Sequence, residues 1–210
     1  MYRLYYAPIS AAMAPQMVLE EIGAAYELVH VDVFGGEIPA WYLELNPNGR
    51  VPTLRYDDQV LWEAAAIVAH LCDRHPEAGL APPPGAPERG RFYQWLLYLA
   101  GTYHPCVKNY YYAQRYSTEA AHVPAIKAKA LETQAGIWRL LDRALGPGPY
   151  LLGERFSAAD LYLFMMVAWL EDLNRKLDQP LALEPNIARF AARLRERPSV
   201  RATLETHGMA

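Results

Sequence analysis

The chain has 210 residues, of which 52% are hydrophobic and 20% charged, which excludes both a disordered tail and a membrane protein. Its net charge of −3 provides no positive field to attract nucleic acid or anionic lipid. Cys72 and Cys106 lack the spacing of a disulfide framework or a zinc site. We therefore expect a cytoplasmic protein of one or two globular domains without metal, nucleic-acid or membrane partners.

Strand and helix patterns alternate over the first 76 residues. Aromatic and apolar runs predict strands at 2–6, 27–33, 53–56 and 59–62. Apolar residues at helical spacing predict helices at 14–24, 40–45 and 63–75. The order β-α-β-α-β-β-α favours a small mixed sheet with helices on both faces, because the first βαβ crossover must be right-handed.

A proline-rich segment follows. Residues 76–87 contain five prolines and two glycines, a density that neither a helix nor a sheet tolerates. We assign 77–87 as a linker between a first domain, 1–76, and a second domain, 88–210.

The second domain has a helical period throughout. Its apolar stripes predict helices over 92–110, 121–145 and 187–194, and Pro198 begins a short last one. Pro105 predicts a kink near Gly101, because its ring removes a backbone donor and clashes with that carbonyl. Ser157 and Asp160 have the spacing of a capping box. The segment 161–170 that follows is apolar on all sides, which is typical of a helix buried at the centre of a bundle.

The two domains and the linker together resemble the glutathione S-transferase family over essentially the whole chain, and bacterial cytosolic members most. The motifs that carry this resemblance are Leu4-Tyr5-Tyr6-Ala7-Pro8, Asn46-Pro47-Asn48-Gly49-Arg50-Val51-Pro52, Glu63 at a helix start, and Ser157-x-x-Asp160. The resemblance implies a thioredoxin-like first domain, an all-helical second domain with an acceptor pocket, glutathione as co-substrate, a homodimer and a role in detoxification.

The resemblance also implies a glutathione-binding set: Arg50, Val51, Pro52, Glu63 and Ala64. Val51, before a cis proline, would pair its N–H and C=O with the cysteinyl unit as an added strand. Glu63 would bind the glutamyl ammonium, and the helix start would bind its carboxylate. Ala64 lacks the hydroxyl usual at this position and leaves only the backbone N–H. Alternatively, Pro52 only shapes a turn and Glu63 is an ordinary acid of a first helical turn.

Ser10 and Tyr6 are the candidate catalytic residues. Relatives stabilise the glutathione thiolate with a side chain of the first strand–helix loop, aided by the positive helix end. The bacterial cysteine of this loop corresponds to Ala11, and neither Ala11 nor Ala12 can donate a side-chain hydrogen bond. Ser10 has the only hydroxyl in this loop, and Tyr6 ends the preceding strand. Ser10 could instead cap the helix or bond a local carbonyl.

The acceptor pocket is assigned to Tyr103, His104 and Tyr111. His104 matches a cleft histidine of the bacterial cysteine-bearing class. Tyrosines are frequent on the same helix and could line a hydrophobic pocket, although core packing would explain many of them equally well.

Three functions follow from these residues. The first is a glutathione transferase that conjugates glutathione to a small hydrophobic electrophile. The second is a glutathione-dependent disulfide reductase or isomerase, although no loop cysteine is present for a mixed disulfide on the protein. The third is a non-catalytic partner-binding protein on the same fold, which the alanines at 11, 12 and 64 favour. Val51-Pro52, Glu63 and His104 count against the third.

Overall fold

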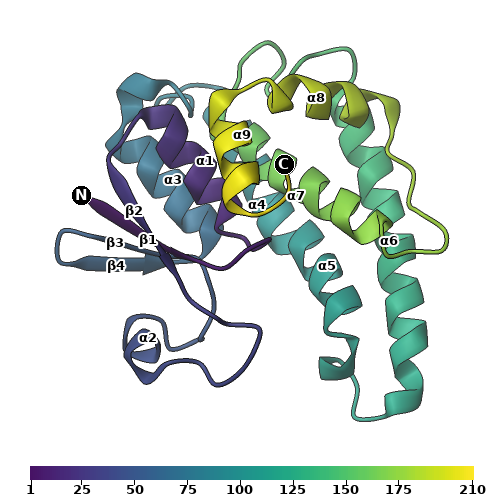
Figure 1. Cartoon of the computed structure of the whole chain (residues 1–210). Coiled ribbons are helices and arrows are strands. Elements are labelled where there is room, and N and C mark those ends of the chain that lie inside the picture. The colour runs from purple at the N-terminus through teal and green to yellow at the C-terminus, as the bar shows by residue number, and fades with distance from the viewer.

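A computed structural model describes residues 1–210, and its first lobe is built on a four-stranded sheet (Figure 1). The strands lie in the order β2-β1-β3-β4, with β1 parallel to β2 and the other pairs antiparallel. Their bounds are β1 Tyr2–Tyr6, β2 Tyr26–His30, β3 Thr53–Tyr56 and β4 Gln59–Trp62. Three helices complete the lobe: α1 Met13–Ile22, α2 Ala40–Leu45 and α3 Ala64–Arg74. The predicted β-α-β-α-β-β-α order and mixed sheet are confirmed.

Alternation along the strands gives the sheet two covered faces, because successive side chains point to opposite sides. Leu4 and Leu54 are fully buried in the core that also contains α1 and α3. Tyr5 points the other way and packs on Tyr42 of α2, with ring centroids 5.7 Å apart. The expected helices on both faces are therefore present.

Strand β2 is shorter than the predicted 27–33. It ends at His30, which pairs with Tyr6, the last residue of β1. Beyond that point β2 has no partner strand, although the Val31 N–H still donates to the Tyr6 carbonyl at 2.8 Å. The hydrophobic residues Val33 and Phe34 belong instead to the loop that reaches the cavity described below.

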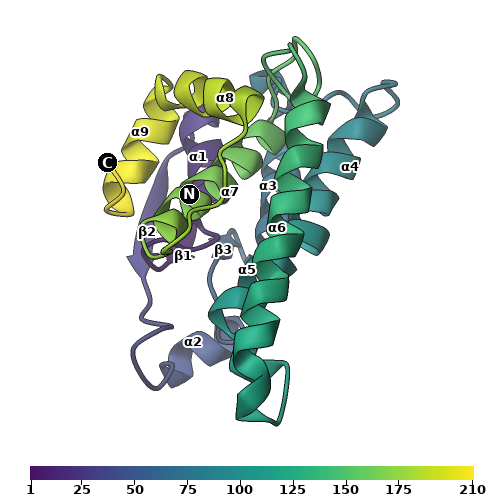
Figure 2. The same cartoon turned by 90° about the vertical axis from the view of Figure 1, so that its right-hand side faces the viewer.

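The second lobe is all-helical. Its helices are α4 Arg89–Tyr98, α5 His104–Tyr111, α6 Val123–Leu145, α7 Ala158–Asn174, α8 Pro185–Arg195 and α9 Pro198–Thr206. Residues 161–170 of α7 are buried throughout, as predicted. The carboxylate of Asp160 accepts hydrogen bonds from the Ser157 N–H at 2.8 Å and the Ser157 hydroxyl at 2.9 Å, so the N-terminus of α7 is capped. Figure 2 shows α5 and α6 side by side along one side of the lobe. None of the helices combines the length and apolar character needed to cross a membrane.

A π-helical turn, Leu99–Tyr103, joins α4 to α5 at the place where Pro105 predicts a kink. Pro105 has no N–H for the Gly101 carbonyl, so the regular ladder of hydrogen bonds cannot continue there. The interruption takes the form of a widened turn, and α5 begins directly after it at His104.

The lobes share one hydrophobic core. Helix α7 packs against α1 and α3, and α9 packs against α1. Arg197 clamps Glu21 of α1 with two hydrogen bonds, at 2.7 and 2.6 Å. The shared core and these helix contacts join the two lobes to each other.

Candidate functional site

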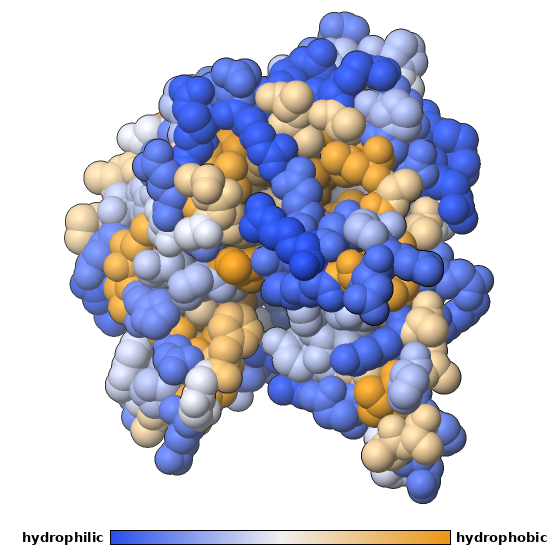
Figure 3. All heavy atoms as spheres, turned by 45° about the vertical axis from the view of Figure 1, so that its right-hand side comes forward, coloured by the Kyte–Doolittle hydropathy of each residue, from blue (hydrophilic) through white to orange (hydrophobic).

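A cavity of about 810 Å³ lies between the lobes. The space-filling view shows the molecule hollowed between its two lower parts (Figure 3). The first lobe contributes the loop before α1, the loop before β3 and the start of α3, and the second lobe contributes α5 and α7. Both lobes therefore supply walls to one site.

Val51 lies in the cavity wall with its backbone unpaired. The Val51–Pro52 peptide bond is cis, as the resemblance implies. Neither the N–H nor the C=O of Val51 forms a hydrogen bond within the chain. The preceding carbonyl, of Arg50, is held by the Tyr42 hydroxyl at 2.6 Å and the Asn46 side-chain amide at 2.7 Å. Both holding residues are buried, so the loop presents a rigid, half-exposed peptide edge.

Tyr42 and Asn46 are functional residues that sequence reasoning missed. The sequence marks Asn46 only as the first residue of the Asn46–Pro52 motif, and Tyr42 only as one residue of a short predicted helix. Their role depends on the contact with the Arg50 carbonyl, which no local spacing indicates.

Glu63 is the N-cap residue of α3 and has a backbone φ of +75°. Residues other than glycine seldom adopt positive φ, and such conformations concentrate at functional sites. Its carboxylate is exposed, belongs to the cavity wall and forms no ion pair within the chain. Ala64, the first residue of α3, is buried in the same wall. The first-turn N–H groups of α3 have no partners in the helix and so favour an anion here.

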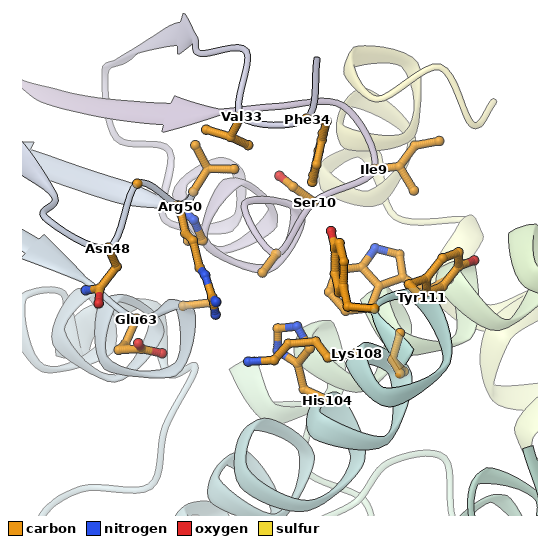
Figure 4. Close-up of a pocket in the computed structure, with 18 of the residues that line it drawn as sticks. Ile9, Ser10, Val33, Phe34, Asn48, Arg50, Glu63, His104, Lys108 and Tyr111 are labelled. Carbon is orange, nitrogen blue, oxygen red and sulfur yellow. The ribbon is translucent and has the colours of Figure 1, made fainter. Parts of the chain in front are cut away.

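Arg50 and Lys108 bring positive charge to the cavity from different lobes. Figure 4 shows both side chains directed into it, on the side where Glu63 lies. Neither forms an ion pair within the chain. Arg115, in the same lining, also forms no ion pair within the chain, so the site offers one free carboxylate and three free cations to a ligand.

Ser10 lies in the cavity wall, but its hydroxyl is engaged locally. It donates to the Ala7 carbonyl at 2.6 Å and accepts from the Ala12 N–H at 3.3 Å. The Ala11 N–H, between them in the chain and also at the cavity wall, donates to no acceptor in the protein. The Ser10 N–H is likewise without an acceptor, so the free donors of this loop at the cavity wall are the backbone N–H groups of Ser10 and Ala11.

Two residues assigned to the site lie outside the cavity. Tyr6 packs edge-on between His30 and His207, with ring centroids 5.7 and 5.5 Å away. Tyr103 is fully buried against Trp138 and donates to the Gln134 side-chain carbonyl at 3.2 Å. The structure therefore places neither ring at the cavity: Tyr6 is half-buried at the end of β1, and Tyr103 is buried in the π-helical turn.

The second-lobe wall contains His104 and Tyr111, as assigned, together with Lys108 and Trp169. His104 packs edge-on against Trp169, with centroids 5.1 Å apart. Burial, with smaller contributions from the Lys108 and Arg50 charges, lowers the pKa of His104 to about 4, so the imidazole is neutral at pH 7. Lys108 follows His104 by four residues, and this spacing, which places both on one helix face, could have identified it from the sequence. No three His, Cys, Asp or Glu side chains are grouped to hold a metal ion.

The comparisons with known proteins agree with this geometry. The N-terminal domain family of glutathione S-transferases matches residues 4–80, and the C-terminal domain family matches residues 124–201. The chain belongs to the glutathione S-transferase family.

Relatives of this family match along the whole chain. The Escherichia coli O157:H7 glutathione S-transferase GstA is 31% identical over 210 residues, covering 99% of both chains. A glutathione transferase structure from Methylococcus capsulatus is 34% identical, with a TM-score of 0.86 and complete coverage of both chains. A sphingomonad glutathione S-transferase, solved in complex with glutathione, is 30% identical with a TM-score of 0.82, covering 99% of this chain and 100% of that one.

Proposed function

We propose that the protein is a glutathione transferase that binds glutathione along the first-lobe wall and conjugates it to a small hydrophobic electrophile. The observation that carries this proposal is that one wall contains two groups without a partner in the chain. They are the peptide edge of Val51 and the carboxylate of Glu63. An extended peptide pairs with the first, and a free ammonium group pairs with the second. Glutathione has both features.

The remaining charges of the cavity fit the same ligand. Glutathione has two carboxylates, and the wall offers the start of α3 at Ala64 and the free cations Arg50 and Lys108. A carboxylate at a helix start is stabilised by unpaired N–H groups and by the helix dipole. This arrangement would orient the tripeptide with its glutamyl end at Glu63 and its thiol toward the start of α1.

The thiolate would be stabilised by the backbone at the start of α1. Ala11 supplies an N–H without another acceptor, and the positive end of α1 adds to it. Ser10 supports this group by fixing the loop through the Ala7 carbonyl. A thiolate held in this way attacks the electrophile as the nucleophile of the transfer.

The electrophile would bind against the second-lobe wall. Tyr111, Tyr112 and Trp169 present aromatic surface there, and Phe34 faces the cavity from the opposite side (Figure 4). The neutral imidazole of His104 adds no charge to this part of the cavity. This aromatic surface suits an apolar or aromatic acceptor.

Calorimetric titration with glutathione and with S-methylglutathione tests the proposal, followed by conjugation of chlorodinitrobenzene. We expect saturable binding of both ligands and measurable turnover with glutathione. Binding without turnover toward any electrophile would favour the partner-binding alternative, since alanines stand where relatives have reactive or hydrogen-bonding side chains. Absence of binding would refute the proposal.

Ser10→Ala separates the two roles open to the Ser10 hydroxyl. A direct hydrogen bond to a thiolate contributes about 1.5–3 kcal/mol, so its loss would raise the pKa of the bound thiol by about one to two units. Because the hydroxyl donates to Ala7 instead, we expect a rise below about half a unit. We expect the free energy of unfolding to fall by about 1 kcal/mol.

The thiolate absorbance of the complex as a function of pH measures the pKa of the bound thiol, and chemical denaturation measures the free energy of unfolding. Tyr6→Phe is the matched control, because Tyr6 lies outside the cavity, and should leave the thiol pKa unchanged. A rise of one unit or more in Ser10→Ala would establish the hydroxyl as the direct thiolate donor.

We further propose that the protein acts in the cytoplasm as a two-fold homodimer in which the first lobe of one chain packs on the second lobe of its partner. Closed two-fold pairs are the commonest soluble assemblies. Trp62 and Leu97, on different lobes, expose 41% and 63% of their surface, which suits such a contact. Sedimentation at micromolar concentration should give twice the chain mass of 23.7 kDa, and a stable monomer would contradict this.

A further inference from the structure

His207 lies directly after α9, at the other end of the chain from the loop before α1. Its side chain nevertheless contacts that loop, which lines the cavity. Its side chain is 2% exposed. The Ile9 N–H donates to its Nδ1 at 3.0 Å. Ile9 is a wall residue of the cavity, two positions before Ala11, and Figure 4 shows it beside the C-terminal segment.

One chain of hydrogen bonds determines which ring nitrogen of the neutral His207 imidazole carries the proton. The Thr206 hydroxyl donates to the Ala202 carbonyl at 3.0 Å, so its oxygen accepts from the Gln16 side-chain amide at 3.0 Å. The Gln16 carbonyl oxygen then faces Nε2 of His207 at 3.1 Å and must accept from it. His207 therefore has its proton on Nε2 and a free lone pair on Nδ1, which is what the Ile9 N–H requires.

The contact holds a backbone conformation that a β-branched residue seldom adopts. Ile9 has a φ of +52°, a value that costs free energy and persists only where the surroundings impose it. The hydrogen bond to His207 fixes the N–H of that same residue. Burial lowers the pKa of His207 to about 4, so Nδ1 stays an acceptor at neutral pH.

The position of this loop matters because it supplies no free side-chain donor. The Ser10 hydroxyl is bound to Ala7, which leaves the backbone N–H groups of Ser10 and Ala11 as the free donors of the loop at the cavity wall. A backbone donor can be aimed only by fixing the backbone around it.

We infer that His207 is a positioning residue of this site, which aims the Ala11 N–H at the thiolate by fixing Ile9. The inference rests on the proposed function, since it assumes that a thiolate binds at this loop.

Two near-isosteric variants separate the hydrogen bond of His207 to Ile9 from its hydrogen bond to Gln16. In His207→Asn the amide oxygen can take the place of Nδ1 and accept from Ile9, while the bond to Gln16 is lost. In His207→Gln the longer side chain can reach Gln16, while the acceptor for Ile9 is lost. Both variants lose the ring that packs on Tyr6, so their packing losses are matched.

The main readout is the thiol pKa of bound glutathione, measured by thiolate absorbance, with turnover toward chlorodinitrobenzene as the second. We expect His207→Asn to stay close to the wild type. We expect His207→Gln to raise the thiol pKa by about half to one unit and to lower kcat about three- to tenfold at neutral pH. Affinity for S-methylglutathione, which has no thiol to ionise, should be the same in all three proteins and reports that each is folded.

Equal thiol pKa values in the two variants, with S-methylglutathione binding intact, would refute the positioning role alone. A wild type that does not bind S-methylglutathione would refute the proposed function and this inference with it. Slow hydrogen exchange at the Ile9 amide in His207→Asn, and fast exchange in His207→Gln, would support the assignment of the acceptor.

Discussion

Glu63→Gln is expected to weaken glutathione binding at least tenfold in calorimetric titration. The Glu63 carboxylate has no partner within the chain and would be the counter-charge of the glutamyl ammonium. Losing one partner of such a pair costs about 2 kcal/mol or more, and about 1.4 kcal/mol corresponds to a factor of ten. Glutamine keeps the size of the side chain, so the loss would reflect the charge.

Glu88→Gln is the matched control for this prediction. Glu88 is also an exposed acid at the N-cap of a helix, α4, but it lies outside the cavity. The control removes the same charge from the same kind of position and should leave the affinity unchanged. An unchanged affinity in Glu63→Gln would remove Glu63 from the site.

Ala64→Ser is expected to tighten glutathione binding about tenfold or more. Ala64 lies in the cavity wall at the first position of α3. A hydroxyl there can donate to the glutamyl carboxylate beside the helix N–H groups, and a hydrogen bond to a charged group contributes about 1.5–3 kcal/mol. Serine is close to alanine in size, so the buried wall can accommodate it.

Ala66→Ser is the control, since Ala66 is in the same helical turn but exposed and outside the cavity. It makes the same chemical change and should not alter the affinity measured by calorimetry. If Ala64→Ser binds no more tightly than Ala66→Ser, the glutamyl carboxylate does not lie at the start of α3.

The fold was largely predictable because its signals are local. Aromatic and apolar runs located the strands, helical spacing located most helices, and the Ser157–Asp160 spacing marked the start of α7. Pro105 located the interruption before α5, but its π-helical form depends on how the freed Gly101 carbonyl is accommodated. The end of β2 was misplaced, since it is set by where its partner β1 stops at Tyr6 and not by its own sequence.

The site was less predictable because its chemistry depends on contacts between distant segments. Arg50, Val51, Pro52, Glu63 and Ala64 come together in one wall, along with Ser10, His104 and Tyr111. The direction of the Tyr103 ring depends on the turn before α5, and the engagement of Ser10 depends on the loop geometry at Ala7. Nothing in the local pattern joins Ile9 to His207, 198 residues further along the chain.

The central claim is that bound glutathione is held as a thiolate at the start of α1, and the thiol pKa of the wild-type complex tests it most directly. Thiolate absorbance is recorded against pH with saturating glutathione, and free glutathione serves as the reference. We expect a pKa below that of free glutathione, because the Ala11 N–H and the helix end favour the anion. A bound thiol that titrates at the same pH as free glutathione would contradict the claim.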